Sequence, residues 1–203
     1  MPEKLTEEQL QALAVRFGLE TAVLQSLAET ASETDAFLPD GRASLFFEGH
    51  LFYRNLEKAG ISPDTCRAGN ENILFREPTI RYDEGGAGEY ARLDKARAIH
   101  PEAALMSASY GMFQIPGERY ADCGFDSVEA FVSAQNESVC RQLETLCTLL
   151  KTQGAIPLLC VHDWPAFSRR YTGTSLAPDD LAWKMGQAYY RHTVRSGNRP
   201  GYR

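Results

Sequence analysis

The stretch from Leu19 to Phe52 constrains the fold of this chain more than any other. It predicts a helix, then a turn at Leu38–Arg42 (LPDGR), then a second helix from about Ser44 to Ala59 that carries Glu48 and His50. Two helices joined by a short Pro/Gly turn favour a helical domain over a β-rich one.

The first of these helices has one clear apolar stripe. Its members recur at helical spacing and are Leu24, Leu27, Ala28 and Ala31. At about 100° per residue, Glu29 and Glu33 lie roughly 140° and 180° around the helix from Leu24. We therefore expect both carboxylates to face solvent and residue 31 to face the interior.

The rest of the chain predicts mostly helix, which makes the fold class mainly α. Helices are expected at 6–17 behind a Thr6 capping box, 89–100, from Pro101, over a long 127–153, as two short pieces in 156–170, and at 178–194. Residues 61–90 are expected to be irregular, with a flexible Gly-rich loop and at most a small hairpin around Ile80.

Composition limits the classes of function. The chain has 203 residues, 43% hydrophobic and 24% charged, which predicts one globular domain over residues 1–195. A net charge of −6 argues against nucleic acid as a partner. Five cysteines without CxxC pairs, and four histidines without ligand spacing, predict no disulfide framework, no metal and no cofactor. Cys140 and Cys147 are expected to be small core residues.

The two ends of the chain differ in charge. The N-terminal segment is acidic. It has no apolar signal-peptide core, so we expect synthesis in the cytoplasm. Residues 191–203 hold four arginines and no acid, and the tail 196–203 either contacts an anionic envelope or is merely solvated.

Six segments, taken together and in order, resemble the phage-type N-acetylmuramidase family, which is related to goose-type lysozymes and lytic transglycosylases. They are Phe37–Arg42 (FLPDGR), Phe46–Arg54 (FFEGHLFYR), Ser107–Ile115 (SASYGMFQI), Gly124–Val132 (GFDSVEAFV), His162–Gly173 (HDWPAFSRRYTG) and Ala182–His192 (AWKMGQAYYRH). The resemblance implies a lysozyme-like α+β fold, a helical bundle around a saccharide groove. It also implies hydrolysis of the β-1,4 bond between N-acetylmuramic acid and N-acetylglucosamine in peptidoglycan.

The chain departs from that family at position 31. The family's general acid is a glutamate that is followed by a serine and lies six residues before the Phe of FLPDGR. In this chain that place holds Ala31, followed by Ser32. Glycoside cleavage needs a carboxylic acid kept protonated near neutral pH. Three explanations are open: an introduced Glu→Ala change, which we favour, a transfer of the acid role to Glu48, or a natural relative that binds peptidoglycan without cutting it.

Several other residues are candidates for the groove. Glu48 is the alternative acid, and Asp83 and Glu84 of the Gly-rich loop are candidates for a second acid, although an ordinary polar loop is an equally good interpretation. The expected saccharide-binding residues are His50, Ser107, Ser109, Tyr110, Gln114, Tyr120 and Tyr171. The small residues of Ser107–Ile115 fit a groove wall or, equally, a close helix–helix crossing.

The sequence therefore predicts a monomeric phage or prophage endolysin of the muramidase type, inactivated at position 31. Its partner would be the glycan strands of the bacterial wall, which it would reach after release from the cytoplasm through a holin-type pore. A lytic transglycosylase giving 1,6-anhydro products and a non-catalytic wall-binding protein are the alternatives.

Overall fold

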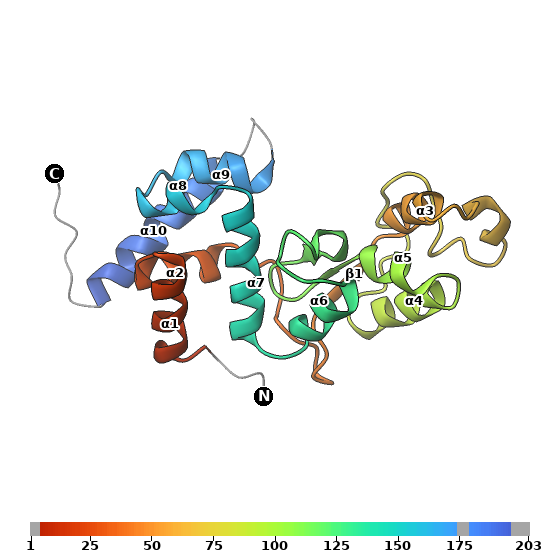
Figure 1. Ribbon diagram of the computed structural model, residues 1–203, viewed down its shortest axis with the longest axis horizontal. Coiled ribbons are helices and arrows are strands. Elements are labelled where there is room, and N and C mark those ends of the chain that lie inside the picture. Colours follow the sequence, from red (N-terminus) through yellow and green to blue (C-terminus); the bar gives the residue numbers. More distant parts are fainter. Residues whose placement is uncertain (1–4, 174–178, 196–203) are drawn as a thin grey trace. The chain divides into compact units, whose positions relative to one another are not determined.

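The structure, a computed structural model, describes residues 5–173 and 179–195 (Figure 1). Helices dominate, and three short strands form one small sheet, so the mainly α fold class is confirmed. The elements are α1 (Glu7–Phe17), α2 (Thr21–Thr30), β1 (Leu45–Phe47), α3 (Gly49–Lys58), η1 (Pro63–Cys66), α4 (Ala87–Arg97), α5 (Pro101–Met106), β2 (Ala108–Tyr110), β3 (Ile115–Pro116), η2 (Gly117–Arg119), α6 (Val128–Gln135), α7 (Val139–Thr152), α8 (Ile156–Cys160), α9 (Trp164–Thr172) and α10 (Asp179–Arg195).

The described residues form two compact units. The sheet unit comprises Glu33–Gln142, and the helical unit comprises the residues before it, up to Ser32, and those after it, from Leu143. The expectation of one domain over 1–195 stays a prediction. The basic tail 196–203 lies outside the described residues.

The sheet unit is built around three short antiparallel strands in the order β1-β2-β3. Phe46 of β1 pairs with Ser109 of β2, and Tyr110 pairs with Ile115 of β3. Aromatic and aliphatic residues suit such a half-buried ladder, and Phe47 and Tyr110 are at most 1% exposed. Helix α4 packs against β1 and α5, and α5 also packs against α3 and α6.

The helical unit is organised by α2 and α10, which pack along each other (Figure 1). Leu24 and Leu27 of α2 and Met185 of α10 are fully buried, so the predicted apolar stripe is confirmed at its centre. Helix α9 packs against both α8 and α10. The Thr6 capping box of α1 is present, with the Thr6 hydroxyl accepting from the Gln9 N–H at 3.2 Å.

Some expected elements were wrong. Residues 45–47 form β1, so the second helix begins at Gly49 and not at Ser44, because that segment pairs with β2. No strand lies around Ile80 in the described residues; the hairpin is β2–β3.

The long helix expected over residues 127–153 is instead two helices, α6 and α7. Helix α6 ends at Gln135. Asn136 is its C-cap residue, and the Asn136 side-chain oxygen accepts from the Ala43 N–H at 2.9 Å. The Ser138 hydroxyl then accepts from the Arg141 N–H at the start of α7.

All five cysteines are free thiols. Cys147 is fully buried, as expected, and burial raises the pKa of its thiol to about 12. Cys140 is half-buried, so the core placement predicted for it was only partly right. Within residues 5–173 and 179–195, none of the helices is both long and apolar enough to span a bilayer.

Candidate functional site

Glu48 stands at the junction of β1 and α3, where the chain turns from strand to helix. It is the N-cap residue of α3, with φ −105° and ψ 94°. Its N–H donates to the Ser107 carbonyl at 2.9 Å, which fixes the junction against the residue before β2. The fold therefore anchors the backbone of this acid on two sides, by the sheet and by the first turn of the helix.

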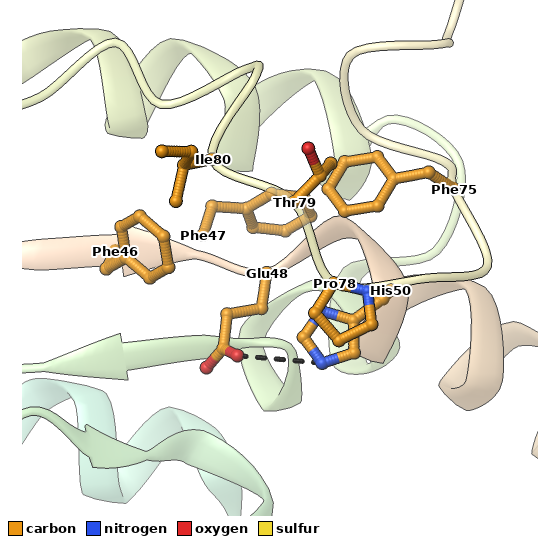
Figure 2. Close-up of a pocket in the computed structure, with 8 residues that line it drawn as sticks. All are labelled: Phe46, Phe47, Glu48, His50, Phe75, Pro78, Thr79 and Ile80. Atoms are coloured by element: carbon orange, nitrogen blue, oxygen red, sulfur yellow. Dashed lines mark ion pairs between the residues drawn. The ribbon is translucent and has the colours of Figure 1, made fainter.

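The Glu48 carboxylate has two polar neighbours in the sheet unit. The Ser109 hydroxyl donates to Oε1 at 3.1 Å, and His50 Nε2 lies 3.8 Å from Oε2. The Glu48 side chain is 23% exposed, so a ligand can reach it. Figure 2 shows the carboxylate turned away from Phe46 and Ile80 and toward His50. The structure thus brings together three residues that the sequence proposed separately.

A cavity of about 450 Å³ adjoins Glu48, a volume typical of sites that hold small ligands. Its lining is largely apolar and consists of Phe46, Phe47, Glu48, His50, Phe75, Pro78, Thr79 and Ile80 (Figure 2). The last four belong to the irregular segment 61–86, so this segment forms one wall of the cavity.

A close approach at Gly49 shapes that wall. A Cβ on Gly49 would lie 2.4 Å from Phe75 Cε1 and 2.8 Å from the Ile73 carbonyl oxygen. The Phe75 ring continues the wall by stacking on His50 and on Tyr82, with centroid distances of 6.5 and 5.5 Å. Only glycine allows the segment to pack this near to the residue that follows Glu48.

A buried ion pair on α4 stabilises the strand and the loop that border the cavity. Arg92 and Glu89 of α4 are 2% and 1% exposed, and the Arg92 guanidinium donates to both carboxylate oxygens. The same carboxylate accepts from the Phe47 N–H at 2.7 Å and from the Glu84 N–H at 3.0 Å. Glu89 therefore fixes both the strand that leads to Glu48 and the Gly-rich loop.

The sequence analysis missed this pair. At i, i+3 in a helix, Glu89 and Arg92 look like Asp94 and Arg97 of the same helix, whose side chains are more than half exposed. No local signal separates the two pairs, because burial is decided by the strand and the loop that pack on α4.

The predicted groove residues of the Ser107–Ile115 segment divide into two kinds. Tyr110 is fully buried, and its hydroxyl donates to the Leu105 carbonyl, so it offers no exposed surface to a saccharide. Ser107 is also fully buried; its hydroxyl donates to the Ala103 carbonyl and accepts from Asn55. Ser109 contacts Glu48, as described. Gln114 is half-buried, has φ +46°, and its side-chain amide donates to the Gly111 carbonyl at 2.7 Å.

The remaining candidates do not join the Glu48 cluster. Asp83 and Glu84 are exposed, and the Asp83 carboxylate accepts from the Gly85 N–H in a local turn. Tyr120 is half-buried at the end of η2. Tyr171 belongs to the helical unit, where its ring stacks on Phe167.

Ala31 is the C-cap residue of α2 and is 4% exposed. Its N–H donates to the Leu27 carbonyl at 2.9 Å. A carboxyl group at this place would be poorly solvated and would lie at the negative end of the helix dipole. Both effects raise the pKa of an acid, which is the environment that a proton-donating glutamate needs.

The two neighbouring acids behave differently from each other. Both residues, Glu29 and Glu33, are exposed, as predicted. The helical geometry used to predict this does not apply to Glu33, because α2 ends at Thr30 and the Glu33 N–H donates to the Met112 carbonyl at 2.8 Å. Loss of solvation raises the pKa of Glu33. Glu29 pairs with Arg191 and His192 of α10; burial raises its pKa, but these hydrogen bonds outweigh burial and lower it overall.

Among the described residues, no cluster of three or more His, Cys, Asp or Glu side chains has an arrangement that would hold a metal ion. The chemistry that the Glu48 cluster offers is that of one carboxylate, one imidazole and one hydroxyl beside an apolar wall. Such a set can transfer protons and bind hydroxylated ligands.

The fold is shared with a known class of protein. The chain has the fold of a crystal structure described as a Burkholderia AP3 phage endolysin, with a TM-score of 0.85 and 31% sequence identity over 96% of this chain and 73% of that one. It is therefore a lysozyme-like protein of the phage-endolysin type.

Residues 20–193 match the family described as Muramidase, N-acetylmuramidase. The chain belongs to the N-acetylmuramidase family, a family of glycoside hydrolases that act on peptidoglycan, as its sequence motifs indicated. A comparison with curated proteins gave no match.

Proposed function

We propose that this chain binds the glycan strands of bacterial peptidoglycan on a muramidase scaffold from which the proton-donating acid is missing. The bond addressed is the β-1,4 linkage between N-acetylmuramic acid and N-acetylglucosamine. The observation that carries the proposal is Ala31, which occupies the poorly solvated end of α2. The resemblance of the FLPDGR segment implies that the family has its glutamate at this position.

The chemical consequence follows from what the reaction requires. The leaving glycosidic oxygen must be protonated as the bond breaks, and a carboxylic acid with a raised pKa supplies that proton. The Ala31 methyl group has no proton to give. General acid catalysis contributes about 10²- to 10⁴-fold, so the chain as it stands is expected to be weakly active or inactive.

Of the three explanations for the alanine, we favour an introduced Glu→Ala change. Alanine has the best helix propensity and fits the end of α2 without disturbing the core. Transfer of the acid role to Glu48 is the strongest rival, because the Ser109 hydroxyl and His50 already orient that carboxylate. A natural wall-binding relative is the third.

We place the protein in phage or prophage lysis. It would act as a monomer on the wall after release from the host cytoplasm, and the Arg-rich tail would add contact with the anionic envelope. The family membership and the endolysin-like fold support this setting.

The test uses purified sacculi and three proteins: the unsubstituted chain, Ala31→Glu and Glu48→Gln. Co-sedimentation measures binding, and mass spectrometry of the soluble products measures cleavage. We expect all three to bind and Ala31→Glu alone to release muropeptides with reducing ends.

Other outcomes discriminate between the alternatives. Products ending in 1,6-anhydro sugars would assign a lytic transglycosylase. If the unsubstituted chain cleaves and Glu48→Gln abolishes this cleavage, Glu48 is the acid. Failure of the unsubstituted chain to bind sacculi would refute the proposal.

A further inference from the structure

A second groove lies in the helical unit, between the end of α2 and one face of α10. It has a volume of about 380 Å³, large enough for a small ligand. Its lining residues are Glu29, Thr30 and Ser32 from the α2 side, and Trp183, Lys184, Gln187 and Arg191 from α10. Thr30 and Ser32 flank Ala31 in the sequence.

Trp183 is the main apolar surface of this groove. Its side chain is 64% exposed, although an indole usually packs most of its surface inside a protein. Gln187 and Arg191 follow it at intervals of four residues, so the three share one face of α10. An exposed indole beside amide and hydroxyl groups is a surface with one apolar face and several hydrogen-bonding groups around it.

The charges of the groove are already balanced. Lys184 Nζ lies 2.6 Å from an Asp180 carboxylate oxygen, one turn earlier on α10. The Arg191 guanidinium contacts the Glu29 carboxylate, which His192 also contacts at 2.9 Å. With His192 neutral, these charges sum to zero, and each charged lining residue has a partner of opposite charge. The lining therefore fits an uncharged ligand that is rich in hydroxyl groups.

We propose that this groove is a saccharide subsite, in which one pyranose ring of a glycan stacks on Trp183. The C–H face of a pyranose is apolar and covers the indole, and the ring's hydroxyl and acetamido groups hydrogen-bond to groove residues such as Gln187 and Ser32. The inference rests on the proposed function, since it takes the ligand to be the N-acetylated glycan of the wall.

The test compares Trp183→Ala with Tyr190→Ala. Tyr190 is a matched control, because it is on the same helix, is 53% exposed and does not line the groove. Binding to purified sacculi is measured by co-sedimentation at a series of protein concentrations. We expect Trp183→Ala to weaken binding about tenfold and Tyr190→Ala to change it less than about twofold.

A direct readout follows from the tryptophan content. The chain has two tryptophans, so in a Trp164→Phe variant the fluorescence reports Trp183 alone. The probe is the β-1,4-linked tetramer of N-acetylglucosamine. We expect a saturable change in emission as the sugar covers the indole.

Three results would overturn the inference. The first is binding of sacculi by the unsubstituted chain that Trp183→Ala leaves equally strong. The second is an emission that the tetrasaccharide leaves unchanged. The third is self-association of the chain that Trp183→Ala abolishes without any response to sugar, which would assign the surface to a second copy. If the unsubstituted chain fails to bind sacculi but its Trp183 emission responds to the tetrasaccharide, the proposed function fails and the subsite stands.

Discussion

The cavity beside Glu48 and the groove beside Trp183 are stabilised by different kinds of contact. Around Glu48, the strand and the loop are fixed by a fully buried ion pair and by a glycine on which an aromatic ring packs. Around Trp183, the lining residues are held by exposed or half-exposed ion pairs, one between α2 and α10 and one along α10. The cavity therefore holds the Glu48 carboxylate rigidly, whereas the groove presents the Trp183 ring on a surface that tolerates small movements.

The largest expected effect is at the buried pair. Glu89→Gln leaves the Arg92 charge unpaired inside the sheet unit, and we expect the free energy of unfolding to fall by about 3–5 kcal/mol. Denaturant unfolding measures it. Asp94→Asn breaks an exposed pair of the same spacing on the same helix and should cost less than about 0.5 kcal/mol. If the two variants lose similar free energies of unfolding, the claim that the cavity beside Glu48 is rigidly built is wrong.

Next comes the glycine at the start of α3. Gly49→Ala places a methyl group against the Phe75 ring and the Ile73 carbonyl, and we expect a loss of about 1–3 kcal/mol in stability. The change should also open the wall of the cavity, which crystallography of the variant would show as a displaced Phe75 ring.

The helical unit offers the opposite case at Gly186 of α10. A Cβ there would lie 3.4 Å from Trp164 Cδ1, an ordinary contact, and alanine has a higher helix propensity than glycine. We expect Gly186→Ala to raise the free energy of unfolding by up to about 1 kcal/mol. A loss as large as that of Gly49→Ala would show that α10 packs against Trp164 as tightly as the start of α3 packs against Phe75.

The smallest effect is a dependence on pH in the helical unit. The pKa of Glu29 is lowered by His192 and Arg191, so its ionised form stabilises the fold above its ordinary pKa of 4.5, and this contribution is lost as the pH falls through the lowered value. Thermal unfolding of Glu29→Gln should therefore show a shallower loss of stability in acid than the unsubstituted chain. Parallel curves would mean that the surface pair contributes nothing.

Much of the fold was predictable from local signals. The Thr6 capping box and the stripe of Leu24 and Leu27 are encoded within a few residues, and the structure has both. The strands were missed because each has at most three residues, too few for a period of two to be distinguished from a helical pattern. Only pairing with β2 makes residues 45–47 a strand.

The candidate site was predictable in part. Glu48, His50 and Ser109 were identified as groove candidates from motifs, and the structure brings them together. Tyr110 was expected at a ligand but lies in the core, because its register in β2 turns the ring toward Phe131. Glu89 and Trp183 carried no signal, since burial of a charge and exposure of an indole are decided by the elements packed around them.

The central claim is that position 31 is the place of the missing acid. The most direct measurement compares Ala31→Glu with Ala31→Gln, which have side chains of the same size and differ in the ability to donate a proton, by the initial rate of reducing-end release from purified peptidoglycan. We expect the glutamate variant to be faster by about a hundredfold or more. Equal rates in two variants with the same melting temperature would contradict the account.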